Sequence, residues 1–172
     1  MKMKDTVLQA LHQQIKMEFD SAMLYLSMAA NMYEAGLDGF GHWLCVQYRE
    51  ELEHGLKIFD YLVERDEKIV LQALDKPFYE WHEPYDLFNL ALEHEQLVTK
   101  SINDLVTLAK REEDYATDIF LHWYVTEQLE EEHQVRDILD KIRIAKDCGN
   151  GLLLIDSELA QRKFNSILPK GE

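Results

Sequence analysis

The sequence predicts an all-α protein, a four-helix bundle followed by a short fifth helix. Four long segments repeat apolar residues every three or four positions, which is the period of an amphipathic helix. Only 7 Gly and 3 Pro occur in 172 residues, so there are few points at which a helix must break. At this length, with 47% hydrophobic residues, the chain is expected to form one domain over residues 1–172.

The five helices are justified in order by their apolar periods and end signals. Asp5 or Thr6 can cap the first helix, and Gly36 can end it. The second helix is followed by the segment KIVLQALDKPFYEWHEPYD, which contains Pro77 and Pro84 and shows no convincing helical pattern. The helices are expected at residues 5–34, 38–67, 86–112, 115–146 and 152–164.

The connections between these helices predict how they are arranged. The first and second helices share a short turn, as do the third and fourth, so each pair should be antiparallel neighbours. The connection between the second and third helices, about 18 residues, is long enough to run the length of a bundle. Two antiparallel hairpins joined by one long crossover are one of the established four-helix bundle topologies.

Composition excludes several classes of function. The net charge of −15 leaves no basic patch for nucleic acid. No apolar run approaches the roughly 20 residues of a membrane span, and the start, MKMKDTVLQALHQQ, turns polar too soon for a signal peptide. Cys45 and Cys148 form no CxxC motif, which favours reduced thiols in the cytoplasm. The acidic excess suits either a solvated surface or a protein that handles cations.

Each of the four long helices places a carboxylate on its apolar face. A single such residue is usually at the edge of the face and extends to water. In this chain, however, the carboxylates of all four helices lie about 15 to 18 residues from the nearest interhelical turn, which places them at nearly one level of the bundle. The four carboxylates are Glu18, Glu51, Glu95 and Glu131, and His54 lies at the edge of the second face.

Four buried carboxylates at one level repel each other unless they are protonated or cations lie between them. No Lys or Arg lies on these inward faces, so metal ions are expected. Carboxylate oxygens with an imidazole suit iron or manganese, and zinc less well. Glu51 and His54 form a Glu-x-x-His pair on one helix face, a pattern typical of di-iron carboxylate proteins.

The fourth helix offers a competing Glu-x-x-His pair at Glu130 and His133. On a helical wheel His133 points away from the core, whereas Gln128 and Glu131 point inward. We therefore expect Glu131 to be a ligand and Gln128 to lie near the site as a hydrogen-bonding or weak ligand group. His133 is expected at the surface.

A second acidic group flanks the first. Glu50, Glu127 and Glu130 point to the side of the apolar faces, either as a solvated charged seam or as an additional metal position. Tyr25 lies two turns beyond Glu18, where it either fills the core or contributes to the site by hydrogen bonding or electron donation.

These residues together resemble bacterial non-haem ferritins. The resemblance rests on Glu18 with Tyr25, on EELEH at 50–54, on HEQ at 94–96 and on WYVTEQLEEE at 123–132. It covers essentially the whole chain, including the crossover and the last helix. It implies a homo-oligomeric hollow shell of about 24 subunits that stores iron as a ferric oxyhydroxide mineral.

The resemblance also implies a ferroxidase centre in each subunit, where dioxygen or hydrogen peroxide oxidises Fe(II). Carried over by position, one iron would be held by Glu18, Glu51 and His54. The second would be held by Glu51, Glu95 and Glu131, with Glu51 bridging the two ions.

The flanking residues also have counterparts in the family. Gln128 matches a residue close to the second iron, and Tyr25 matches a tyrosine beside the centre. The resemblance implies a third iron site at Glu50, Glu127 and Glu130.

Two departures separate the chain from bacterioferritin, the haem-binding relative. That family has methionine after the bridging glutamate, where this chain has Leu52, and it has Glu and His where this chain has Gln128 and Glu131. No haem is therefore expected. Two other functions are alternatives to iron storage. One is a di-iron oxidase of the rubrerythrin kind, which would form a small oligomer, although the usual cysteine-ligated iron motif is absent from the sequence. The other is a plain helical bundle that acts as an interaction module.

Overall fold

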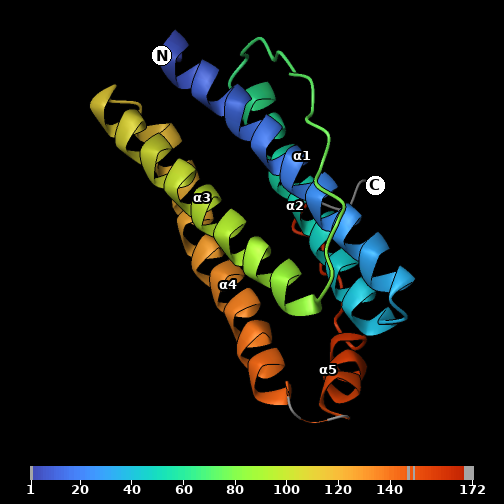
Figure 1. The fold of residues 1–172 in the computed structure, drawn as a ribbon. Coiled ribbons are helices and arrows are strands. Elements are labelled where there is room, and N and C mark those ends of the chain that lie inside the picture. Colours follow the sequence, from blue (N-terminus) through green and yellow to red (C-terminus); the bar gives the residue numbers. More distant parts are fainter. Residues whose placement is uncertain (1, 147, 149, 169–172) are drawn as a thin grey trace.

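The computed structural model describes residues 2–146, 148 and 150–168, and within them the secondary structure consists of five helices and no strand (Figure 1). The helices are α1 (Asp5–Glu34), α2 (Asp38–Glu64), α3 (Pro84–Arg111), α4 (Tyr115–Ala145) and α5 (Gly151–Leu159). α1 and α2 pack together, α3 and α4 pack together, and α1 contacts α3. The short helix α5 packs against α2 and α4. The predicted fold class is confirmed. In this part of the chain no helix is long and apolar enough to cross a bilayer.

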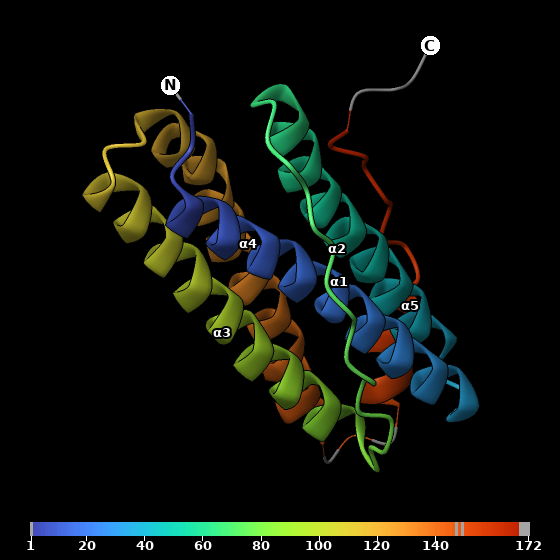
Figure 2. The ribbon, with the colours of Figure 1, turned by 90° about the horizontal axis from the view of Figure 1, so that it is seen from above.

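The long connection between α2 and α3 is not helical and runs along the outside of α1, as Figures 1 and 2 show. Hydrogen bonds to α1 hold it there. The backbone N–H of Asp75 donates to Asp20 Oδ1 over 2.9 Å, and Ser27 Oγ donates to the carbonyl of Phe78 over 2.7 Å. The connection therefore brings the chain back along the bundle, so that α3 begins beside α1.

Helix α2 ends at Glu64, earlier than the expected residue 67, because Asp66 adopts a left-handed φ of 55°. The N–H of Glu67 then donates to the carbonyl of Leu62 over 3.1 Å, which closes the helix end. Glu113, with φ of 59°, ends α3 in the same way at 111 rather than 112. At the end of α1 this conformation belongs to Gly36, the residue that the sequence had marked.

The other expected boundaries also shift. α3 begins at Pro84 rather than at 86, because the fixed φ of proline suits the first helical position. α4 ends at Ala145, one residue before the expected end. α5 ends at Leu159 rather than at 164, because the chain then turns back along α2, where His42 Nε2 lies 2.8 Å from the carbonyl oxygen of Arg162.

The apolar core is divided into two clusters with a polar layer between them. One contains Tyr25, Met28, Phe40 and Phe88 among others, and the second contains residues such as Ile15. On every long helix at least one buried glutamate lies between members of the two clusters. The residues that make this layer are Glu18 on α1, Gln47, Glu51 and His54 on α2, Glu95 on α3, and Gln128 and Glu131 on α4.

Helix α5 caps the start of α2. The backbone N–H of Phe40 donates to Asp156 Oδ1 over 3.0 Å, and this N–H has no partner within its own helix because it lies in the first turn. The helices approach so closely that a Cβ on Gly39 would lie 1.7 Å from the carbonyl oxygen of Asp156. A glycine is therefore required at the point where α5 docks.

We expect Gly39→Ala to lower the free energy of unfolding by about 2 kcal/mol, because α5 must move away and the capping bond is lost. The thermal midpoint, measured by circular dichroism, should fall by about 4–8 °C. Asp60→Ala, at an exposed position of the same helix, is the matched control. Equal midpoints for the two variants would contradict the docking role of Gly39.

Candidate metal centre

The polar layer brings one carboxylate from each long helix, together with an imidazole, into the interior of the bundle. None of these five side chains is more than 2% exposed. A charged group at this depth is strongly destabilising unless it is paired or protonated. The five residues are Glu18, Glu51, His54, Glu95 and Glu131.

The first expected ligand set is assembled in the structure. Donor atoms of Glu18, Glu51 and His54 lie within 4.8 Å of one another, close enough to hold one metal ion. Nδ1 of His54 is 3.5 Å from Glu51 Oε2, one helical turn away. Tyr124 fixes this turn of α2, since its hydroxyl donates to the carbonyl of His54 over 2.7 Å.

The second expected ligand set consists of Glu51, Glu95 and Glu131. Its donor atoms do not form a group within 4.8 Å of one another. The second group of donor atoms within 4.8 Å consists instead of His54, Glu127 and Glu131. The carboxylate of Glu95 is held elsewhere by hydrogen bonds. Its Oε1 accepts a hydrogen bond from the hydroxyl of Tyr25, and its Oε2 accepts one from Gln128 Nε2 over 3.0 Å. Hydrogen bonding to the site is one of the roles that the sequence allows for each of these two residues.

Two buried amides that the sequence analysis missed hold the remaining carboxylates. Gln14 Nε2 donates to Glu18 Oε1 over 2.8 Å. Gln47 Nε2 donates to Glu51 Oε1 over 3.0 Å and to Glu131 Oε2 over 2.6 Å, so one amide joins carboxylates from α2 and α4. Each glutamine precedes its glutamate by one i, i+4 step on the same apolar face, and this spacing is a signal that the sequence carries.

One carboxylate oxygen of the layer is fully buried and has no hydrogen-bond partner among the described residues. Oε2 of Glu18 is buried, and in the described part of the chain no protein atom donates to it. An orphaned acceptor at this depth is costly unless a proton or a cation satisfies it. Glu18 is one of the three residues whose donor atoms lie within 4.8 Å of one another, so its carboxylate is available to a cation.

Burial changes the protonation of the layer. Burial, with the nearby charge of Glu51, raises the pKa of Glu18 and of Glu95 to about 8. Burial lowers the pKa of His54, but Glu51 outweighs this effect and raises it to about 10. Burial likewise opposes ionisation of Glu51, yet His54 brings the pKa of Glu51 below its ordinary value. Without metal the layer therefore holds one Glu–His ion pair among largely protonated carboxyls.

The flanking acidic residues lie beside this layer. Glu50, Glu127 and Glu130 line a cavity of about 180 Å³, into which His54 also opens. Glu50 is paired with Arg162 from the segment after α5. The sequence analysis did not foresee this contact, because no local pattern links the two residues. His133 is exposed whereas Gln128 and Glu131 are buried, so the expected register of α4 is confirmed.

Comparison with known proteins shows one family. Residues 8–145 match the ferritin-like domain. A bacterial non-heme ferritin from Campylobacter jejuni is 44% identical over 150 residues, which are 87% of this chain and 90% of that protein. One from Staphylococcus epidermidis is 38% identical over 160 residues, 92% and 96% of the two chains. A solved open pore ferritin from the archaeon Archaeoglobus fulgidus has a TM-score of 0.92 at 43% identity and covers 94% of this chain and 98% of its own.

The raised carboxyl pKa values predict how the metal-free protein responds to pH. A group whose pKa is about 8 when folded and near 4.5 when unfolded stabilises the fold at low pH, and this contribution is lost as pH rises from about 5 to 8. The neutral variant Glu18→Gln cannot titrate. Its free energy of unfolding should therefore fall by about 2 kcal/mol less over this range than that of the unmodified protein.

Urea unfolding with a chelator at pH 5, 6.5 and 8 measures this difference. Glu64→Gln, at an exposed position of α2, is the control and should follow the unmodified protein. A Glu18→Gln profile parallel to the control would show that Glu18 is already ionised in the metal-free fold.

Proposed function

The chain belongs to the ferritin family, and from this premise we propose that it stores iron and acts as a ferroxidase. Fe(II) would be oxidised to Fe(III) by dioxygen or hydrogen peroxide at a paired site in each subunit, and ferric oxyhydroxide would be deposited in a hollow shell. One observation carries the proposal. Four helices each bury one carboxylate at a single level around an imidazole, in a layer with an orphaned acceptor oxygen.

Glu51 is the proposed bridge of the paired site. One iron would bind Glu18, Glu51 and His54, whose donor atoms are already close together. The other would bind Glu51, Glu95 and Glu131, and Gln47 supports this assignment because it holds the carboxylates of Glu51 and Glu131 with one amide. The side chain of Glu95 would turn from its present hydrogen bonds toward the ion.

The ligand set suits the oxidation. Hard carboxylate oxygens favour the more highly charged ferric ion, so they lower the iron potential. Two adjacent ions can supply two electrons to one oxidant, which a single Fe(II) cannot do. The protons on Glu18 and Glu95 leave when the cations bind, because each ligand must be ionised. Tyr25 and Gln128 would hold Glu95 before and after this exchange.

The flanking cavity is the proposed third iron position. Glu50, Glu127 and Glu130 supply carboxylates around it, and His54 borders both this cavity and the paired site. An ion leaving the pair would therefore meet oxygen ligands within a short distance. No haem is proposed, because the chain has Leu52 where the haem-binding relatives have methionine.

Storage requires a shell, which we propose to be a homo-oligomer of 24 subunits like other ferritins. The net charge of −15 per subunit would concentrate cations around such a particle. Metal-free protein loaded in air with many Fe(II) ions per chain, followed by light scattering and iron absorbance during size-exclusion chromatography, tests this. We expect a large shell that co-elutes with far more iron than its side chains can bind. A small oligomer with about two irons per chain would instead indicate a rubrerythrin-like oxidase.

Replacing both Glu51 and His54 with Ala should abolish the fast phase of Fe(II) oxidation, a loss of at least about 100-fold, because the bridge and the imidazole are removed together. Stopped-flow absorbance of the ferric product measures this. The control carries Glu64→Ala and His133→Ala, the same residue types at exposed positions. Unchanged kinetics in the Glu51, His54 variant would remove the paired site from the mechanism.

A further inference from the structure

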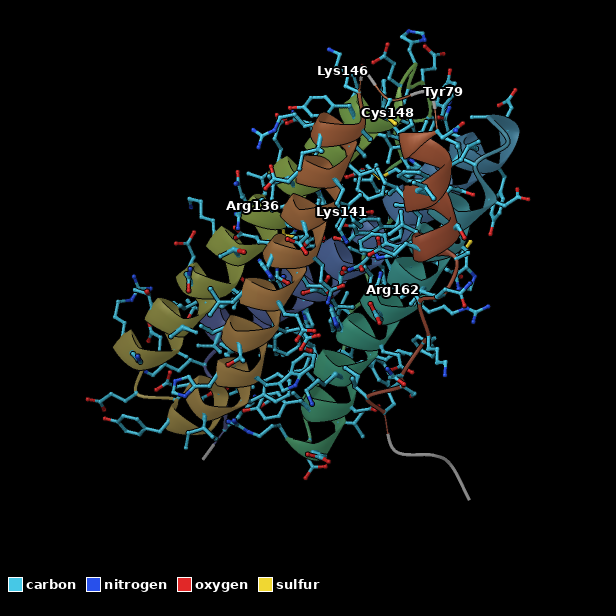
Figure 3. All side chains as sticks on the ribbon, turned by 90° about the horizontal axis from the view of Figure 1, so that it is seen from below. Tyr79, Arg136, Lys141, Lys146, Cys148 and Arg162 are labelled. Carbon is cyan, nitrogen blue, oxygen red and sulfur yellow. The ribbon has the colours of Figure 1, made fainter. Side chains whose placement is uncertain are left out.

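Arg162 lies in the segment that follows α5 and passes alongside α2, as Figures 2 and 3 show. Its side chain is only 14% exposed although no helix contains it. Nη2 donates to Glu50 and, over 3.1 Å, to Gln134 Oε1. Nη1 donates to Gln47 Oε1 over 2.9 Å and to the carbonyl of Trp43 over 3.3 Å. The guanidinium carbon also lies 4.2 Å from the centre of the Trp43 ring, so one face of the group packs on an aromatic ring while both terminal nitrogens donate hydrogen bonds.

One side of this guanidinium reaches the paired site through Gln47. The amide of Gln47 is fully buried and could in principle be turned either way. Arg162 donates to its oxygen, so its nitrogen must face Glu51 and Glu131, to which it donates. Arg162 thus fixes an amide that in turn orients two proposed iron ligands.

The other side of the guanidinium reaches the flanking cavity. Glu50 lines that cavity with Glu127 and Glu130, and its carboxylate is the one that pairs with Arg162. The same C-terminal segment contributes Asn165 and Ile167 to the lining. A positive charge is therefore already present on one of the three carboxylates at which a third cation would bind.

We propose that Arg162 is a positioning residue for the paired site and a counter-ion that a third metal ion must displace from Glu50. The inference rests on the proposed function, because it takes these carboxylates as iron ligands. A planar guanidinium has separate N–H groups on its two nitrogens, so it can hold Gln47 and Glu50 at once. When a third ion displaces Arg162 from Glu50, the guanidinium that also holds Gln47 would be disturbed. Filling of the third position would therefore affect the orientation of Gln47.

The segment does not depend on this guanidinium for its attachment. The backbone N–H of Ile167 and the hydroxyl of Ser166 both donate to the carboxylate of Glu53. Arg49 lies over the ring of Phe164, 5.9 Å from its centre. A change at Arg162 is therefore expected to alter the two acidic sites while the segment stays in place.

Metal binding to the assembled, metal-free protein tests the proposal without iron oxidation. Zn²⁺ titration calorimetry counts the ions and gives their affinities, and the visible spectrum of bound Co²⁺ reports the geometry of the paired site. Glu130→Gln identifies the third ion, which this variant should lose. Arg136→Gln, which removes an exposed arginine of α4 that is also labelled in Figure 3, is the matched control.

In Arg162→Gln we expect the third Zn²⁺ to bind about tenfold more tightly and the Co²⁺ spectrum of the first two ions to change. Arg162→Lys keeps the charge but cannot reach Glu50 and Gln47 together. It should leave the third affinity near that of the unmodified protein and still alter the spectrum.

An unchanged third affinity in Arg162→Gln would overturn the counter-ion role, and an unchanged Co²⁺ spectrum would overturn the positioning role. Absence of two tightly bound ions in the unmodified protein would overturn the proposed function itself. One titration series therefore distinguishes failure of the inference about Arg162 from failure of the proposed function.

Discussion

The structure depends on one constraint: four carboxylates are buried at the same level of a narrow bundle. Ionised together and without partners they would oppose folding by far more than the few kcal/mol that separate a folded from an unfolded chain. The apolar clusters above and below exclude water from the layer, so the compensation must come from within it. Protons on Glu18 and Glu95, the Glu51–His54 ion pair and the amides of Gln14 and Gln47 provide it when no metal is bound.

Much of this layer could be predicted from the sequence, because a helix converts position along the chain into direction and depth. The inward direction of Glu131 and the outward direction of His133 follow from counting about 100° per residue. The common level of the four carboxylates follows from counting residues back to each turn. The long non-helical crossover follows from its prolines and from the loss of the helical period, and it requires α3 to start beside α1.

The features that could not be predicted depend on geometry that no local pattern encodes. Asp66 and Glu113 end helices in a left-handed conformation that glycine adopts more readily, so no residue type at these positions marks a helix end. Arg162 lies more than 100 residues from Glu50 and Gln47, and a basic residue expected in the last turn of a helix at 152–164 does not reveal a buried partner. Gln47 was within reach of prediction, since it precedes Glu51 by one helical turn on the same face.

The way the layer is neutralised bears on how a ferroxidase centre would handle its ions. A storage protein must bind iron, oxidise it and pass it on, so a centre that binds metal too tightly would stop after one cycle. Protons compete with metal for Glu18 and Glu95 near neutral pH, and hydrogen bonds from Tyr25 and Gln128 compete for Glu95. Each competitor weakens net metal affinity, because its interaction must be broken when the ion enters and is regained when the ion leaves. The interactions that make the metal-free fold stable are thus the ones that would let the site empty.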